Sequence, residues 1–183
     1  IRIYLNYEEL FSDLGIQFCR FLGELGLVAS VAGTLDQFSS EEFKKVVMKS
    51  ENTSFIIEHL AGVSDYILSE DLDIVSEGLA RYDSVLELAK YKNVFIKVPG
   101  LGELNIRPQS LSNDSPFEFD NNNLIKKTLG SFGSDHMMWG SDFPPVSNRE
   151  GYKNALEAVR RLEFLSDQDK KNIFQLVPIK LFF

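Results

Sequence analysis

The chain of 183 residues is 44% hydrophobic and 25% charged, and its formal net charge at pH 7 is −8. This composition is typical of a globular chain that forms one domain over residues 1–183, and it excludes intrinsic disorder. An acidic chain without a stripe of Lys and Arg lacks the charge pattern of a nucleic-acid binder, and no run of 18 apolar residues is present to span a membrane.

Cys19 is the only cysteine, so the chain forms no internal disulfide, and its apolar neighbours predict a small buried side chain. The sequence starts with Ile1 and shows no basic segment followed by an apolar one, which is the pattern of a secretory leader. We therefore expect a cytoplasmic protein whose partner is a small molecule, with no nucleic acid and no membrane as partners. The sequence does not determine whether the chain forms an oligomer.

Short apolar runs alternate along the chain with longer segments of helical periodicity. The apolar runs predict strands at Ile1–Leu5, Leu27–Val31, Ser54–Glu58, Val94–Val98 and Met137–Gly140. The periodic segments predict helices at Glu8–Leu25, Ser39–Lys49, Asp73–Lys90, Leu124–Phe132, Glu150–Phe164 and Asp167–Val177. Leu101–Phe119 is a polar, proline-containing loop, and loops of this length are usually functional or disordered.

The sequence also predicts helix starts and inward faces. Ser39 with Glu42, and Ser166 with Asp169, have the spacing of capping boxes at helix N-termini. The apolar spacing predicts three inward helix faces: Leu10, Leu14, Phe18, Phe21, Leu22 and Leu25; then Val75, Leu79, Tyr82, Leu86 and Ala89; then Tyr152, Leu156, Val159 and Leu162.

Strict alternation of strand and helix predicts an α/β fold with a parallel sheet covered by helices. Two architectures fit this order: an open doubly wound sheet and a (β/α)8 barrel. A barrel needs eight strands, whereas five are expected here. If the fold is a barrel, about three strands lie outside this sequence, and the first residue, Ile1, places them upstream.

Polar residues stand where the predicted strands end, the edge at which ligands gather in parallel α/β folds. His59 follows the third strand, Asp142 follows the fifth, and Lys97 lies near the end of the fourth. Because side chains alternate along a strand, we expect His59 to share a face with Ile57 and Glu58 to point to the opposite face.

Each of these residues also has a plain structural interpretation. His59 would be a hydrogen-bonded histidine, Asp142 a turn former before Phe-Pro, and Lys97 an ion-paired lysine. We expect His136, which precedes the fifth strand at the end opposite the site, to be structural. Taken together, however, His59 and Asp142 would converge if the sheet closes. An imidazole and a carboxylate can polarise a carbonyl and activate a water, and both suit a divalent metal.

Four segments, in this order, resemble the amidohydrolase-2 family, a TIM-barrel branch of the amidohydrolase superfamily, and in particular its lactonase-like members. These segments are Ile1–Leu5, Ile56–Gly62, Asn93–Leu101 and Met138–Pro144, and the tail Leu165–Phe182 is similar to the closing helix of the family. The last of the four segments is the most specific.

The resemblance implies a partial (β/α)8 TIM barrel that holds strands four to eight, with the N-terminal strands and their His-x-His motif missing. It also implies that Asp142 is the water-activating base and that His59 is the second catalytic residue, while Lys97 and Ser141 bind substrate. His59 and Asp142 would be metal ligands only if a metal is bound. The resemblance does not determine the cofactor, which is either one divalent metal such as zinc or none.

Some positions depart from the family pattern. The end of the second strand, Ala29–Gly33, holds no histidine, which argues against the metal site of the decarboxylase-like members. Pro145 stands where the family often has histidine, and Leu176-Val177-Pro178 replaces a Gly-Asn-Ala segment. We expect a hydrolase that opens a small lactone or ester with Asp-activated water. The alternatives are a non-catalytic truncated or degenerate barrel that acts as a binding module, and a metal-dependent decarboxylase.

Overall fold

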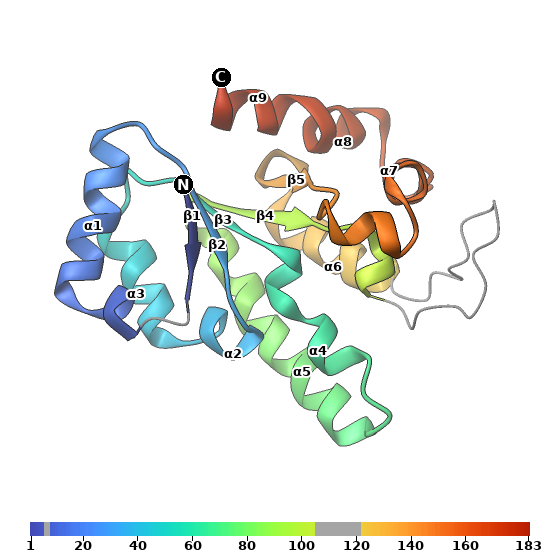
Figure 1. Ribbon diagram of the computed structural model, residues 1–183, viewed down its shortest axis with the longest axis horizontal. Coiled ribbons are helices and arrows are strands. Elements are labelled where there is room, and N and C mark those ends of the chain that lie inside the picture. The colour runs from blue at the N-terminus through green and yellow to red at the C-terminus, as the bar shows by residue number, and fades with distance from the viewer. Residues whose placement is uncertain (6–7, 105–121) are drawn as a thin grey trace.

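Five parallel strands form one sheet in the computed structural model, which describes residues 1–5, 8–104 and 122–183. Every neighbouring pair is parallel, and the strand order follows the chain without reversal (Figure 1). A sequential order has no switch point, so it is the order of a barrel sheet and not that of a doubly wound sheet. The strands are β1 (Arg2–Tyr4), β2 (Ala29–Ala32), β3 (Phe55–Ile57), β4 (Val94–Val98) and β5 (Met137–Trp139).

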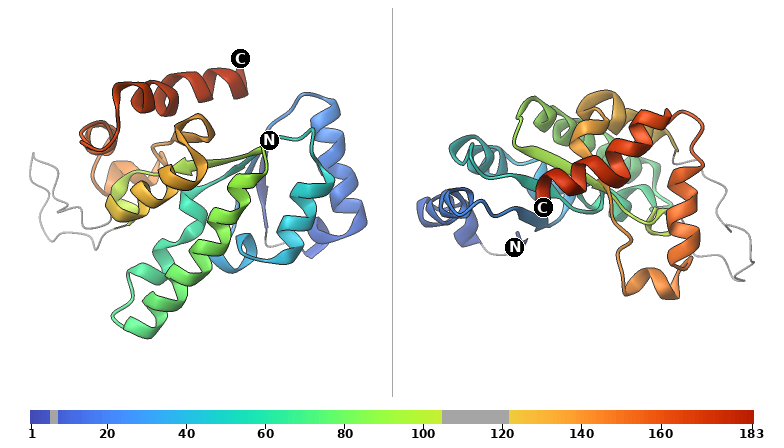
Figure 2. Two further views of the ribbon diagram at one scale, coloured as in Figure 1. Left: turned by 180° about the vertical axis from the view of Figure 1, so that it is seen from behind. Right: turned by 90° about the horizontal axis from the view of Figure 1, so that it is seen from above.

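Helices cover both faces of this sheet. Helices α1, α3 and α5 lie on the side opposite to α8 and α9 (Figures 1 and 2). The helices are α1 (Asp13–Glu24), α2 (Leu35–Phe38), α3 (Glu41–Lys49), α4 (Ser64–Ile67), α5 (Leu72–Leu86), α6 (Asn122–Phe132), α7 (Tyr152–Arg160), α8 (Asp167–Lys171) and α9 (Val177–Phe182). Across the described ranges, none of them has the length and apolar character needed to cross a bilayer. Most of the loop predicted over 101–119 lies outside the described residues.

The two faces of the sheet carry different side chains. Phe55 and Ile57 of β3 belong to the large core between the sheet and the helices α1 to α6. Ile56 lies on the opposite face, in register with Phe95 of β4, and both join a small cluster with Met138 and with α9. This second face leads towards Lys97, so it is the one that opens into the candidate site.

Helix α1 buries a different face from the predicted one. Its buried residues are Gly15, Ile16, Cys19 and Leu22. Leu14, Phe18, Phe21 and Leu25 are exposed, so of the six residues predicted to face inward only Leu10 and Leu22 are buried. The reason lies at the helix start, because Glu8–Phe11 forms a separate 3-10 turn and Ser12 caps α1 by accepting the N–H of Gly15. The buried side of α1 is the one whose residues Ile16, Cys19 and Leu22 join the core.

Two further helix starts can be compared with the sequence. The predicted capping box of Ser39 and Glu42 is wrong, because Ser40 caps α3 and the capping box is formed by Thr34 and Gln37 at α2. The box of Ser166 and Asp169 at α8 is confirmed. Since several Ser and Thr residues precede these helices, spacing alone did not identify the true cap.

The inward faces of α5 and α7 are confirmed only in part. Tyr82 and Leu86 are buried as predicted, but Leu79 is exposed. Val159 and Leu162 are also buried as predicted, whereas Tyr152 is exposed at the start of α7 and the buried face there includes Ala155 and Ala158. Small alanines let α7 approach the rest of the molecule closely, so the larger apolar side chains beside them remain at the rim.

The last helical region is longer than predicted. It was expected to end near Val177, but a π turn at Asn172–Leu176 joins α8 to α9, which runs to Phe182. Pro178 cannot donate a backbone hydrogen bond and would collide with the preceding turn of a regular α-helix. The wider π turn accommodates this proline, so the helix continues instead of stopping.

Cys19 is fully buried in α1, as predicted. Burial raises the pKa of its thiol to about 11, because the thiolate would lose its hydration. Cys19 is therefore a packing residue, with no place in the chemistry described below.

Candidate functional site

A pocket of about 240 Å³ opens at the carboxyl ends of the strands. Ionisable side chains from the carboxyl ends of β3, β4 and β5 line it, which is the placement expected for a site in a parallel sheet, and Arg2 reaches it from the start of β1. Its polar and charged lining residues are Arg2, Glu58, His59, Lys97, Ser141 and Asp142.

The chain turns sharply where β3 ends, and this turn brings His59 into the pocket. His59, Leu60 and Ala61 have φ values of 55°, 46° and 62°, in the left-handed region that non-glycine residues seldom adopt. Glu58 also lines the pocket, so the prediction that His59 and Glu58 point to opposite faces is wrong. Alternation places Glu58 on the face of Ile56, which is the pocket face, and only the turned backbone lets His59 join it.

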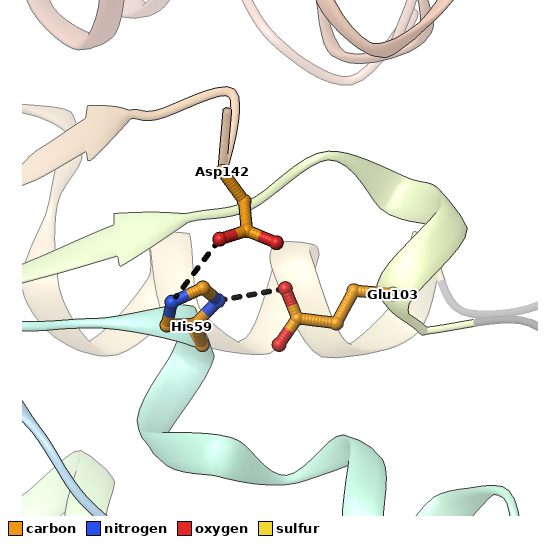
Figure 3. A group of neighbouring side chains, drawn as sticks. All are labelled: His59, Glu103 and Asp142. Carbon is orange, nitrogen blue, oxygen red and sulfur yellow. Dashed lines mark hydrogen bonds and ion pairs between the residues drawn. The ribbon is translucent and has the colours of Figure 1, made fainter. Parts of the chain in front are cut away.

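His59 is surrounded by three carboxylates, and Figure 3 shows two of them, Glu103 and Asp142. Its Nδ1 lies 2.7 Å from Oε2 of Glu103, and its Nε2 lies 3.5 Å from Glu58 and 3.7 Å from Oδ1 of Asp142. Burial lowers the pKa of this histidine, but the hydrogen bonds and charges of Glu103, Glu58 and Asp142 outweigh it and raise the pKa to about 9. At neutral pH, His59 is therefore an imidazolium with a proton on each ring nitrogen.

Asp142 follows β5 and faces His59 across the pocket. Its φ is 56°, a conformation that Asp and Asn tolerate better than most residues. One carboxylate oxygen, Oδ2, lies 3.1 Å from Nη1 of Arg149, whereas Oδ1 points towards Nε2 of His59 at 3.7 Å. The two residues that the sequence singled out are thus brought together, and Oδ1 is the carboxylate oxygen that faces His59.

Lys97 points into the same pocket from β4. Its Nζ lies 3.2 Å from Oε1 of Glu58 and 3.3 Å from Oγ of Ser30. The stem of Lys97 fits because Gly140 is opposite, where a Cβ would lie 2.7 Å from Cδ of the lysine. Lys97 is therefore ion-paired, as its plain structural interpretation predicts, and its ammonium still lines the pocket.

Glu58 is the common partner of the cations on this side of the pocket. It is 5% exposed, and it accepts hydrogen bonds from Arg2 at 2.7 Å, Ser30 at 2.6 Å and Lys97 at 3.2 Å. Burial would raise the pKa of this carboxyl, but the hydrogen bonds from His59 and Ser30 and the charge of Lys97 hold it well below its usual range. Glu58 therefore remains an anion and fixes Lys97 in place.

Two other residues named from the sequence have simpler surroundings. Ser141 lines the pocket, and its hydroxyl accepts the backbone N–H of Phe143 at 3.3 Å, which stabilises the turn that contains Asp142. His136 lies at the other end of the sheet, where its ring stacks on Phe95 with centroids 4.8 Å apart and its Nε2 is 3.3 Å from the carbonyl of Lys92. His136 does not line the pocket.

The sequence did not point to four charged residues of the site, one of which is Arg2 in β1. Glu103 lies in the short 3-10 turn after β4, and Arg149 and Glu150 lie just before α7. None of them directly ends a strand, so the rule that located His59 and Asp142 could not find them. The Pro99-Gly100 sequence at the end of β4 was the only available indication that the chain bends back towards the site there.

A divalent metal is the cofactor to test against this geometry. One nitrogen of His59 and one oxygen each of Glu103 and Asp142 lie within 4.8 Å of one another, and they are ligand types that zinc accepts. Arg149, however, already pairs with two of these donors, since its Nη1 lies 3.1 Å from Asp142 and 3.7 Å from Glu103. As arranged here, the three residues do not fit a divalent ion.

Comparison with known proteins gives a consistent result for the family and the fold. A sequence model of the family described as Amidohydrolase (Amidohydro_2) matches residues 4–183. A search of curated proteins found no match. Several solved structures are similar. In each of those described below, the match includes nearly all of this chain but less than two thirds of the other protein.

Two of these structures are of one amidohydrolase from Burkholderia multivorans. Its HEPES-bound crystal structure has a TM-score of 0.79 at 17% identity, over 98% of this chain and 63% of that one. Its zinc-bound structure has a TM-score of 0.77 at 16% identity, over 98% and 62%. A Pseudomonas putida protein described as a 2-pyrone-4,6-dicarboxylic acid hydrolase has a TM-score of 0.72 at 17% identity, over 99% and 62%. At these identities the likeness shows the fold, a five-stranded part of a TIM-type barrel.

Proposed function

The chain belongs to the amidohydrolase family, whose sequence model matches residues 4–183, and on that basis we propose that it hydrolyses a small lactone in the pocket between His59 and Asp142. The observation that carries the proposal is the pairing of a carboxylate and an imidazolium across a pocket at the carboxyl ends of the strands, 3.7 Å apart at their nearest atoms. One group can accept a proton and the other can donate one, as acyl transfer to water requires.

The reaction would begin with a water held by Oδ1 of Asp142. The carboxylate takes a proton from the water while the water oxygen bonds to the carbonyl carbon of the lactone. Negative charge then develops on the carbonyl oxygen, where Nε2–H of His59 and the ammonium of Lys97 are the available donors. When the ring C–O bond breaks, the leaving oxygen takes up the proton from Asp142, and the product is a hydroxy acid.

The charges around the pocket favour a substrate that carries a carboxylate. Arg2 and Lys97 both line the pocket and share Glu58 as their counterion. Two cations thus share one anion, and a carboxylate of the substrate would supply the second anion. The similarity to a protein described as a 2-pyrone-4,6-dicarboxylic acid hydrolase supports the same substrate class. The pocket volume of about 240 Å³ suits one small ring with its substituents.

His59→Gln tests the proposal, with His136→Gln as the matched control. We expect the His59 variant to lose about 10²–10³-fold in kcat on a carboxylated lactone, because the oxyanion loses a charged donor. His136 stacks on Phe95 at the far end of the sheet, so its replacement should leave turnover unchanged. Steady-state hydrolysis of a panel of carboxylated lactones measures both. Equal turnover by wild type and the His59 variant would exclude His59 from the reaction.

A further inference from the structure

Arg149 is held in the site by a buried carboxylate. Its Nε lies 3.3 Å from Oε2 of Glu150, whose side chain is 2% exposed. The other oxygen of Glu150 accepts the backbone N–H of Gly102 at 3.1 Å. Residue 102 must be glycine, because a Cβ there would lie 2.2 Å from the Glu150 carboxylate. Glu150 thus fixes the guanidinium of Arg149 relative to the turn that carries Glu103.

The guanidinium reaches the two carboxylates that could otherwise bind a metal. Nη1 of Arg149 lies 3.1 Å from Oδ2 of Asp142 and 3.7 Å from Oε2 of Glu103. The Arg149 side chain is only 21% exposed, so water screens these contacts weakly. Four carboxylates meet here, Glu58, Glu103, Asp142 and Glu150, and Arg149 touches the last three of them.

We propose that Arg149 supplies, from within the chain, the positive charge that a divalent metal would supply between Glu103 and Asp142, and that it thereby keeps metal out of this site. A guanidinium offers several N–H donors in a fixed plane, so it can hold two carboxylates close together against their mutual repulsion. A metal ion would need the same oxygen atoms and would place two further positive charges beside Arg149, and juxtaposed like charges are unfavourable.

The inference goes beyond the proposed hydrolysis, because it can be tested without a substrate. Co²⁺ is the probe, since its visible absorbance reports coordination by protein ligands. The titration is made with wild type, Arg149→Met, Arg149→Lys and the control Arg160→Met. Arg160 is a surface arginine that pairs with Glu157, so its replacement removes the same charge away from the site. Circular dichroism checks that each variant is folded.

We expect wild type, Arg149→Lys and Arg160→Met to bind Co²⁺ weakly and Arg149→Met to bind it at least about tenfold more tightly, because a buried like charge has been removed. The gain should disappear when Asp142→Asn is added to Arg149→Met. Should Arg149→Met fail to fold, Arg149→Met with Glu150→Gln replaces it, since the buried carboxylate is then neutralised as well.

Two results would overturn the inference. One is an Arg149→Met variant that binds Co²⁺ no more tightly than wild type. The other is a wild-type chain that binds Co²⁺ as tightly as the variant and loses this binding in Asp142→Asn, because Arg149 would then not exclude the ion. Neither result depends on turnover, so failure of the proposed hydrolysis and failure of this inference are distinguishable.

Discussion

Asp142→Asn should abolish lactone hydrolysis while the fold remains intact. The carboxamide has nearly the same shape but cannot accept a proton from water, and loss of general-base catalysis commonly costs about 10²–10⁴-fold. Asn also tolerates the left-handed backbone at this position, where φ is 56°, so the turn after β5 should survive. The measurement is kcat/KM on a lactone panel, with thermal unfolding recorded for the same samples.

Asp135→Asn is the matched control for this experiment. Asp135 has a 74% exposed side chain and lies before β5, next to His136 and away from the pocket. We expect it to behave as wild type. If Asp142 were only a turn former, Asn would serve equally well and the Asp142 variant would also keep its activity. Turnover of Asp142→Asn at the wild-type rate would remove Asp142 from the mechanism.

Glu58→Met should cause the largest loss of stability among single changes in the pocket. Met has a similar volume but leaves the ammonium of Lys97, whose side chain is 21% exposed, with only the hydroxyl of Ser30 as a partner. Breaking a buried ion pair from one side costs about 3–5 kcal/mol of unfolding free energy. Denaturant unfolding measures this free energy, and Glu41→Met, on the exposed face of α3, should change it by no more than about 0.5 kcal/mol.

A double variant separates the ion pair from general damage to packing. In Glu58→Met with Lys97→Met, both buried charges are gone, and apolar replacement of a whole pair is often close to neutral. We therefore expect the double variant to be more stable than Glu58→Met alone. A double variant that is less stable than either single one would show that the pair contributes in some other way than by neutralising Lys97.

The same pair predicts how stability depends on pH. The pKa of Glu58 is lowered in the folded chain from its ordinary value of 4.5. A lowered pKa stabilises the fold above that ordinary value, and this stabilisation is lost as the pH falls and the carboxyl becomes protonated. The stability difference between wild type and Glu58→Met should thus be complete at neutral pH and shrink below about pH 4.5.

The strand pattern was predictable because each strand is a short apolar run between polar turns. The five predicted strands occur in the expected order, with ends shifted by at most two residues. Helix faces were less predictable, because α1 carries apolar residues on two sides. Leu14 and Phe18 are as apolar as Ile16, and only the cap at Ser12 and the position of the sheet decide which side is buried.

The candidate site, too, could be predicted only in part from the sequence. His59 and Asp142 could be found because each follows a strand, but the strand rule assigned His59 to the face of Ile57, whereas it lines the pocket beside Glu58. The rule assumes an extended chain, whereas the backbone is left-handed at His59 and Leu60. Glu103 and Arg149 enter the site from loops, and the contacts that place them join residues far apart in sequence, which no local pattern encodes.

The central claim is that water activated at Asp142 attacks the carbonyl of a carboxylated lactone. Its most direct test is hydrolysis in H₂¹⁸O, with mass spectrometry of the product from wild type and from Asp142→Asn at equal protein concentration. We predict that wild type forms a hydroxy acid with one ¹⁸O in its new carboxylate, and that the variant forms none above the uncatalysed background. Labelled product at equal rates from both proteins, or none from wild type with any carboxylated lactone in the panel, would contradict the account.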